Sequence, residues 1–237
     1  MENNNFKMGL RDGLPICLGY FAVSFGFGLL SVSEGLAWYQ ALFISMFNLT
    51  SAGQLAAVPI IAGGGAFVEL VATQLVINSR YALMSVSLTQ RLGRGVRLRD
   101  RFLIGFANTD EIFAVAIGKE QMLGRRYMQG LILLPYLGWT LGTLLGSAAG
   151  SILPSVLVTA LSISLYAMFV AIVLPAAKRS IKTLICVLCA MALSSAFYYI
   201  PVLNKVPSGF VIVICTVTVS AVFALAAPIK ESGVGDA

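Results

Sequence analysis

The residues best suited to chemistry are polar side chains in the middle of an apolar stretch. Residues 102–118, FLIGFANTDEIFAVAIG, are apolar at both ends and polar at Asn108, Thr109, Asp110 and Glu111. Two adjacent carboxylates inside hydrocarbon cost on the order of several kcal/mol unless a cation pairs with them or water reaches them. A cavity, an ion path or a bound substrate would explain them. The alternative is an ordinary short loop at the membrane surface.

A second set of polar residues lies in the apolar stretch 66–90. Its members are Glu69, Thr73, Gln74, Asn78 and Arg80. Helical spacing places Glu69, Thr73 and Arg80 near one face, with Asn78 beside Gln74. An arginine cannot discharge itself by losing its proton, so we predict that Arg80 pairs with the carboxylates of the first set. The alternative is that its side chain extends to the membrane surface.

A third polar run interrupts residues 36–62. It reads Asn48-Leu49-Thr50-Ser51-Ala52-Gly53-Gln54, and its candidate transport residues are Asn48, Thr50, Ser51 and Gln54. Such a run favours a broken helix whose freed backbone groups line a cavity. The alternative is that these side chains only hold neighbouring helices together.

The composition around these residues predicts an all-α, polytopic helical membrane protein. Hydrophobic residues make up 58% of the chain and charged residues 11%, and the mean hydropathy is +0.89. A spanning helix needs about 20 apolar residues, and most of eight apolar stretches reach that length. They are roughly 14–32, 36–62, 66–90, 102–118, 127–151, 154–177, 183–203 and 208–229. We expect six to eight transmembrane segments, one or two of them broken or re-entrant. Residues 1–237 then form a single membrane domain, with a polar N-terminus at 1–12 and a short tail at 230–237.

Charge and composition also argue against several functions. The net charge of +6 resides in the connections, where it indicates cytoplasmic loops rather than binding to nucleic acid. The chain has no histidine, and Cys186 and Cys189 form a CxxC pair without a second such pair. We therefore expect no metal, no cofactor and no catalytic centre.

The positions of the loop charges favour re-entrant stretches. If 36–62 and 102–118 each return to the side they entered, every loop Lys and Arg except Lys205 lies inside. If all eight stretches cross, the arginines of 91–101 lie outside, which the positive-inside rule disfavours. A seven-crossing version, with only 102–118 re-entrant and the N-terminus outside, ranks between these two. Both better arrangements place the connections 91–101 and 119–126 together on the cytoplasmic side.

A ladder of glycines indicates close helix packing in the stretch 127–151. Gly138, Gly142, Gly146 and Gly150 recur at every fourth position, which exposes the backbone along one helix face. This face can meet another helix of the same chain or a second subunit.

Several of these segments resemble the AzlC family of branched-chain amino-acid permeases. The similar segments, in chain order, are GLPICLGYFAVSFGFG at 13–28, SAGQLAAVPIIAGG at 51–64, LVINSRYALMSVSL at 75–88, TDEIFAV at 109–115 and GWTLGTLLGSAAG at 138–150. The resemblance implies a permease of the bacterial cytoplasmic (inner) membrane that exports branched-chain amino acids or close apolar analogues. It also implies a small hydrophobic AzlD-type membrane subunit as partner.

The chemistry of such a substrate fits the polar residues of the chain. A zwitterion with an apolar side chain needs a site for each charge and an apolar pocket. A helix end freed near Ser51 offers the carboxylate its N–H groups, and Asp110 or Glu111, with Asn108, offers the ammonium group a partner. The apolar pocket is expected from Phe47, Leu55, Phe106 and Ile112. Without histidine, a coupled proton would need a carboxylate. The alternative function is a channel-like conductor built from the same broken helices.

Overall fold

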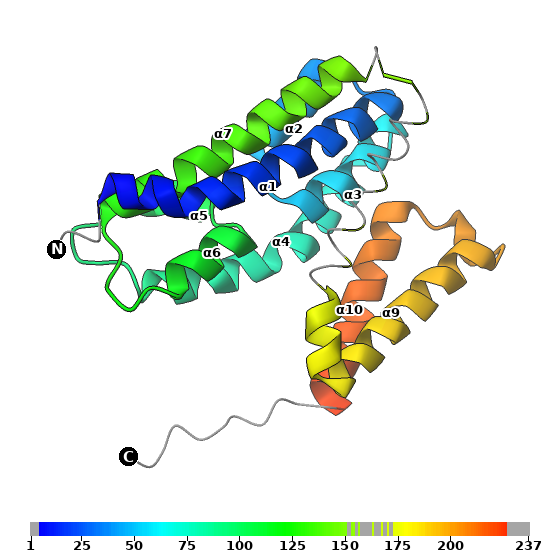
Figure 1. Ribbon diagram of the computed structural model, residues 1–237. Coiled ribbons are helices and arrows are strands. Elements are labelled where there is room, and N and C mark those ends of the chain that lie inside the picture. Colours follow the sequence, from blue (N-terminus) through cyan, green and yellow to red (C-terminus); the bar gives the residue numbers. More distant parts are fainter. Residues whose placement is uncertain are drawn as a thin grey trace.

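Helices form all the regular elements of the described chain. The computed structural model describes residues 5–150 and 173–226, together with 153, 154, 156, 163, 167 and 170. The elements (Figure 1) are α1 (Phe6–Ser33), α2 (Trp38–Phe47), α3 (Ser51–Ala62), α4 (Phe67–Thr89), α5 (Leu98–Phe106), α6 (Asp110–Ile117), α7 (Arg125–Ala149), α9 (Ile181–Tyr199), the 3-10 helix η1 (Leu203–Lys205) and α10 (Ser208–Ala226). The all-α prediction is confirmed. Most of the predicted segment 154–177, and the tail 230–237, lie outside the described residues.

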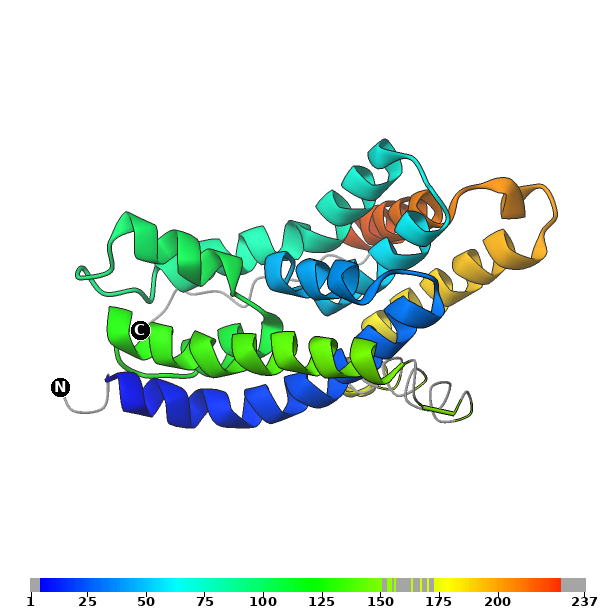
Figure 2. The ribbon, with the colours of Figure 1, turned by 90° about the horizontal axis from the view of Figure 1, so that it is seen from above.

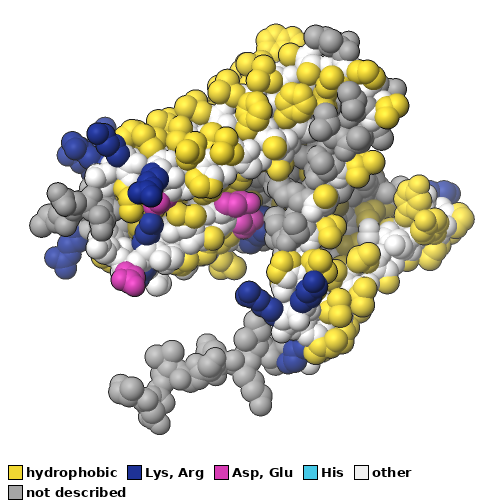
Figure 3. Space-filling view, in the orientation of Figure 1, with side chains coloured by type: hydrophobic (Ala, Val, Ile, Leu, Met, Phe, Trp, Pro, Cys, Tyr) yellow, Lys and Arg dark blue, Asp and Glu magenta, His cyan; other side chains and the backbone are white. Residues whose placement is uncertain are grey.

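Within the described residues, four helices are long and apolar enough to cross a membrane. They are α1, α7, α9 and α10. Helix α4 has 23 residues, which is also enough to span a bilayer, but Glu69 and Arg80 make it more polar. Apolar side chains cover much of the surface along the long helices, whereas Lys and Arg gather at the end where the N-terminus lies and at the lower end of the C-terminal helices (Figure 3). This distribution is that of a helical membrane protein, as predicted.

Helices α1 and α7 pack side by side and run in the same direction (Figure 2). A Cβ added to Gly13 would lie 2.8 Å from the carbonyl oxygen of Leu131, and one added to Gly28 would lie 2.6 Å from the amide nitrogen of Ser147. The contacts therefore advance along both helices together, and the backbones touch. The seven-crossing version is wrong, because it requires these two helices to run in opposite directions.

The glycine ladder of α7 faces α1 of the same chain. Added Cβ atoms at Gly138, Gly142 and Gly146 would collide with the backbone of Cys17, Phe21 and Phe25. At Gly150 an added Cβ would meet the Val32 side chain of α1 and the Ser147 carbonyl of α7, both at an ordinary distance of 3.6 Å. Of the two neighbours left open by the sequence, the structure places a helix of the chain itself against the ladder.

Helices α5 and α6 form a hairpin that enters and leaves the bundle at one end. The connections before and after this hairpin bind each other directly. The Gly93 N–H donates to the Leu123 carbonyl (2.9 Å), and the Leu123 N–H donates to the Arg91 carbonyl (2.8 Å). The stretch 102–118 therefore does not cross the bundle. Its re-entrant form is confirmed, and the version with eight crossings is wrong.

Helices α2 and α3 form another hairpin, which enters from the opposite end; in chain order α2–α3 is the first hairpin and α5–α6 the second. Helix α2 follows the C-terminal end of α1, and α3 precedes the start of α4. Helix α4 runs against α1, since Leu88 near its end packs in one cluster with Tyr127 at the start of α7. The two hairpins thus come from opposite ends, and each is broken by non-helical residues, 48–50 in the first and 107–109 in the second. Both breaks fall in the predicted polar runs.

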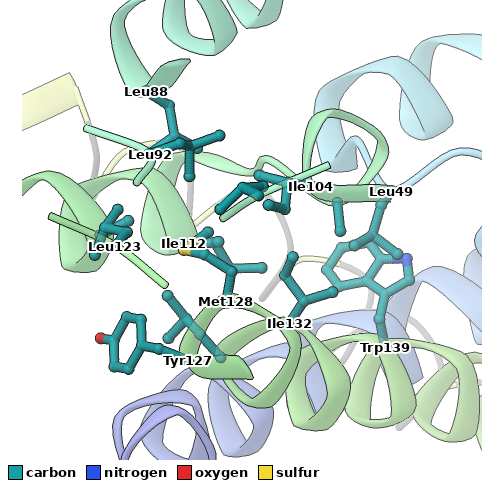
Figure 4. Close-up of a cluster of buried hydrophobic side chains, with 14 of the residues drawn as sticks. Leu49, Leu88, Leu92, Ile104, Ile112, Leu123, Tyr127, Met128, Ile132 and Trp139 are labelled. Atoms are coloured by element: carbon teal, nitrogen blue, oxygen red, sulfur yellow. The ribbon is translucent and has the colours of Figure 1, made fainter. Parts of the chain in front are cut away.

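The main hydrophobic cluster packs the second hairpin against α1, α4 and α7. It includes Leu88, Ile112, Leu123, Tyr127, Met128 and Trp139. Leu49 and Trp139 lie at one end of this cluster, and Leu123 and Tyr127 lie at the other (Figure 4). Leu49 belongs to the break of the first hairpin, so the cluster extends from the connections at one end of the bundle to the place where the hairpins meet.

The C-terminal helices α9 and α10 form a separate hairpin beside α3 and α4 (Figure 1). Helix α10 is fastened to α4 at its first turn, where the Gly209 N–H donates to Glu69 Oε1 at 2.8 Å. A carboxylate at a helix N-terminus is favourably placed for the helix dipole. Helix α9 has no buried residue, so its surface is available to lipid.

Candidate functional site

The breaks of the two hairpins meet at a small cavity within the bundle. Its lining residues come from α1, α4, α7 and both breaks, and they are Tyr20, Leu49, Ser51, Tyr81, Thr109, Asp110, Glu111 and Trp139. Helices α3 and α6 both begin at this cavity, so two positive helix ends converge on it. The cavity volume is about 10 Å³, which is about the space that one water molecule requires.

An ion pair joins α4 to the tip of the α5–α6 hairpin. Arg80 Nη2 lies 2.7 Å from Asp110 Oδ2, and the two side chains are 46% and 34% exposed. The Arg80 guanidinium also lies 4.8 Å from the centre of the Tyr81 ring and donates to the Tyr81 hydroxyl at 3.0 Å. The predicted pairing of Arg80 with a carboxylate of the NTDE run is confirmed. The guanidinium thus has an anionic partner in the α5–α6 hairpin.

A tyrosine of α1 holds the start of α6. The Tyr20 hydroxyl lies 2.5 Å from Thr109 Oγ1 and 2.5 Å from Glu111 Oε2. Thr109 also caps α6, because its hydroxyl oxygen accepts the Ile112 N–H at 3.4 Å. Tyr20 therefore connects the long α1–α7 pair to the carboxylate end of the second hairpin.

A buried chain of hydrogen bonds holds the first hairpin to α7. The Trp139 Nε1–H donates to Gln54 Oε1 (3.0 Å), and Gln54 Nε2 donates to Ser45 Oγ (2.9 Å). Ser45 Oγ lies 2.7 Å from Thr143 Oγ1. The Trp139 ring packs edge-on against Tyr20, with ring centres 5.1 Å apart. Gln54, a predicted site residue, thus acts here by positioning Trp139, which itself lines the cavity.

The other polar residues of the first break bind α4. Asn48 Nδ2 and Asn78 Nδ2 both donate to Gln74 Oε1, at 3.2 and 3.1 Å. Thr50 donates to Asn48 Oδ1 (2.8 Å), and Gln74 Nε2 donates to the Gly53 carbonyl (2.8 Å). For Asn48, Thr50 and Asn78 the geometry fits the alternative in which polar side chains hold helices together. Ser51 does line the cavity.

Two further predicted site residues do not line the cavity. Asn108 is buried and donates to Ser85 Oγ at 3.1 Å, so it fastens the hairpin to α4. Thr73 lies beside α10, where a Cβ added to Gly209 would come within 2.6 Å of its hydroxyl. Glu69 and Thr73 thus meet α10, whereas Arg80 meets α6 further along the helix. Because α4 is one continuous helix, the three residues do share one face, as predicted, but that face has two different neighbours. Helical spacing predicts the direction in which each side chain leaves α4, but it does not predict which helix that side chain meets.

The apolar part of the site differs from the expectation. Phe47 and Phe106 are exposed, and Leu55 and Ile112 pack into separate hydrophobic clusters. The cavity is lined instead by Tyr20, Leu49, Tyr81 and Trp139. In the sequence, the clue to these tyrosines and this tryptophan is their polar group. A buried O–H or N–H in an apolar helix needs a hydrogen-bond partner.

A family model and several known membrane proteins match this chain. The family model described as "AzlC protein" matches residues 15–153. The chain is 29% identical to "Inner membrane protein YgaZ" of Escherichia coli over 58% of each chain. It is 31% identical to an uncharacterized membrane protein of Archaeoglobus fulgidus, over 58% of this chain and 59% of the relative. It is 27% identical to one of Helicobacter pylori, over 59% of this chain and 64% of the relative. The match thus spans less than two thirds of these relatives. No solved structure matches the chain.

Proposed function

The chain belongs to the AzlC family, and we propose that it is a permease for branched-chain amino acids or close apolar analogues. The function is then transport rather than catalysis, with export across the bacterial cytoplasmic membrane as its direction. The relative from Escherichia coli is named an inner membrane protein, which supports this localisation.

The observation that carries the proposal is the meeting of two broken hairpins around charged residues. Transporters commonly bind their substrates near the bilayer midplane, between discontinuous helices that enter from opposite sides. Here the cavity between the breaks contains Asp110 and Glu111, with Arg80 paired to Asp110. The cavity is too small for an amino acid, so binding requires the hairpin tips to separate, as alternating access demands.

The lining of the cavity is suited to a zwitterion with an apolar side chain. The carboxylates can receive an ammonium group, while the first turn of α3 at Ser51 presents N–H groups toward a carboxylate. Leu49 and Trp139 give the cavity an apolar wall. A coupled proton would be carried by Asp110 or Glu111.

A small AzlD-type membrane subunit is part of the proposal. The ladder of α7 is occupied by α1, so we expect the small subunit to contact another surface of the chain.

The decisive experiment is counterflow of radiolabelled leucine in proteoliposomes, with and without a co-purified small subunit. A permease exchanges internal unlabelled leucine for external label and saturates with concentration. Asp110→Asn and Glu111→Gln proteins should insert normally and lose most of this exchange, whereas Glu120→Gln, in an exposed loop, should retain it. The proposal fails if the unaltered protein, with its small subunit, gives no exchange of any branched-chain amino acid. A leucine flux without saturation or counterflow would support the channel-like conductor instead.

A further inference from the structure

The charges around the cavity do not balance. Arg80 is paired with Asp110 at 2.7 Å, and in the described chain no Lys or Arg forms a salt bridge with the neighbouring Glu111. The partner of Glu111 is the neutral hydroxyl of Tyr20. Two carboxylates thus share one guanidinium. A carboxylate at this depth is costly without a positive partner, so the site as a whole favours one additional cation.

Aromatic rings surround the place where that cation would lie. Tyr20, Tyr81 and Trp139 line the same cavity as Glu111. The face of Tyr81 is occupied by the Arg80 guanidinium, whereas Tyr20 and Trp139 contact each other edge-on. A carboxylate beside tyrosine and tryptophan rings is a favourable environment for an ammonium ion, because ring faces attract cations most strongly where water is excluded.

We propose that Glu111, Tyr20 and Trp139 form the subsite for the substrate ammonium group, while the Arg80–Asp110 pair remains intact. This inference rests on the proposed function and assigns the ammonium group to one of the two carboxylates. An ammonium group has three N–H donors. Glu111 Oε2 and Thr109 Oγ1, which now contact the Tyr20 hydroxyl, can accept two of them once that hydroxyl is displaced.

The size of the cavity supports the same assignment. A space of about 10 Å³ accepts a group the size of water, which matches an ammonium group but not the remainder of an amino acid. The amine is therefore the part of the substrate whose size matches this cavity. Ligands with an amine should bind at this subsite even without a carboxylate, whereas ligands with only a carboxylate should not.

Trp139 makes the subsite directly observable. The chain has only two tryptophans, and the other, Trp38, is 53% exposed at the start of α2. In a Trp38→Phe protein the fluorescence of Trp139 alone reports on the cavity. The purified full-length protein is titrated in detergent with leucine, with isoamylamine (the amine without the carboxylate) and with isocaproate (the carboxylate without the amine).

We expect leucine and isoamylamine to change the Trp139 emission saturably, and isocaproate to leave it unchanged. Glu111→Gln should weaken isoamylamine binding by about tenfold or more, the loss expected for a hydrogen bond to a charged group. Glu120→Gln, in the same Trp38→Phe protein, is the matched control and should bind as before. The comparison of the three ligands needs no change at Glu111, so it remains decisive even if Glu111→Gln does not fold.

The outcomes separate this inference from the proposed function. If leucine binds while isoamylamine does not, or if Glu111→Gln binds isoamylamine normally, the ammonium subsite is refuted and the permease proposal stands. If isoamylamine binds through Glu111 but leucine neither binds nor exchanges, the subsite stands and the proposed substrate is wrong. Saturable binding of isocaproate equal to that of isoamylamine would also overturn the assignment.

Discussion

Arg80 Nη2 and Asp110 Oδ2 lie 2.7 Å apart and join the long helix α4 to the first residue of α6. This contact brings together two polar runs that are distant in the sequence. Because each side chain is partly exposed, the pair borders the cavity rather than a sealed core. It is therefore a contact that movement of the α5–α6 hairpin can break and remake.

A double-mutant cycle tests this pair. Arg80→Ala alone should be strongly destabilising, because it leaves two carboxylates without a cation inside the membrane. Asp110→Asn removes one of these carboxylates, so the double variant should be more stable than Arg80→Ala alone. We expect an interaction energy of about 0.5 to 3 kcal/mol, as for other residues in contact. Thermal unfolding of the purified proteins measures it, and strictly additive effects would refute the coupling.

A labelling experiment tests the two hairpins in cells. On a background without cysteine, Arg94→Cys and Glu120→Cys lie in the two connections that flank the α5–α6 hairpin, and both residues are exposed. Both should resist an impermeant thiol reagent in intact cells and react after lysis. Glu34→Cys and Ala66→Cys, at the other end of the bundle, should both react in intact cells. Reaction of Arg94→Cys but not Glu120→Cys, or the reverse, would contradict the re-entrant hairpin.

The sequence predicted the breaks and the charge pairing because each produces a local conflict with its surroundings. Asn48-Leu49-Thr50 and Asn108-Thr109 interrupt apolar runs, and an arginine at position 80 needs an anion. The O–H of Tyr20 and the N–H of Trp139 indicate that each needs a polar partner if it is buried. Their location at the cavity could not be predicted, because an aromatic residue in an apolar stretch is equally compatible with lipid or core. Their position depends on how helices distant in the sequence pack.

The glycines illustrate the same limit. The spacing of the ladder predicted that a helix backbone lies against α7, since glycine permits close approach. The spacing could not identify that helix, because any helix whose backbone can approach closely satisfies the pattern. Gly13 and Gly28 of α1 meet α7 closely, but their spacing does not match the ladder's period. Only the structure, in which α1 and α7 run parallel, shows that glycines of each helix meet the backbone of the other.

The close packing of α1 and α7 can be tested at a single glycine. In Gly146→Ala the added methyl group would collide with the Phe25 backbone, and such overpacking costs about 1 to 3 kcal/mol. Gly19→Ala is the matched control, because an added Cβ there has no neighbour within 4 Å. It should be neutral or stabilising by up to about 1 kcal/mol, the gain in helix propensity. Both are measured by thermal unfolding.

The same variants distinguish a fold contact from a subunit contact. If α1 covers the ladder, Gly146→Ala should lower the stability of the large subunit even when it is purified alone. Normal stability of the isolated variant together with loss of a co-purifying small subunit would instead show that this face meets a partner.

The buried chain from Trp139 to Ser45 gives the last prediction. Gln54 is fully buried, so Gln54→Leu leaves the Trp139 N–H without its acceptor. An unsatisfied buried polar group costs about 1 to 3 kcal/mol, and the free energy of unfolding should fall by this amount. Trp139→Phe removes the orphaned N–H, so the double variant should lose less than the sum of the two single losses.

Denaturation in detergent, followed by circular dichroism, measures these losses, with Gln121→Leu in an exposed loop as the control. The Gln54 variant should also impair leucine exchange, because it loosens the hydrogen bonds that hold the first hairpin and one wall of the cavity in place. If the single losses simply add, Gln54 and Trp139 act independently. If Gln54→Leu instead unfolds like the unaltered protein, the hydrogen-bond chain does not hold the first hairpin against α7.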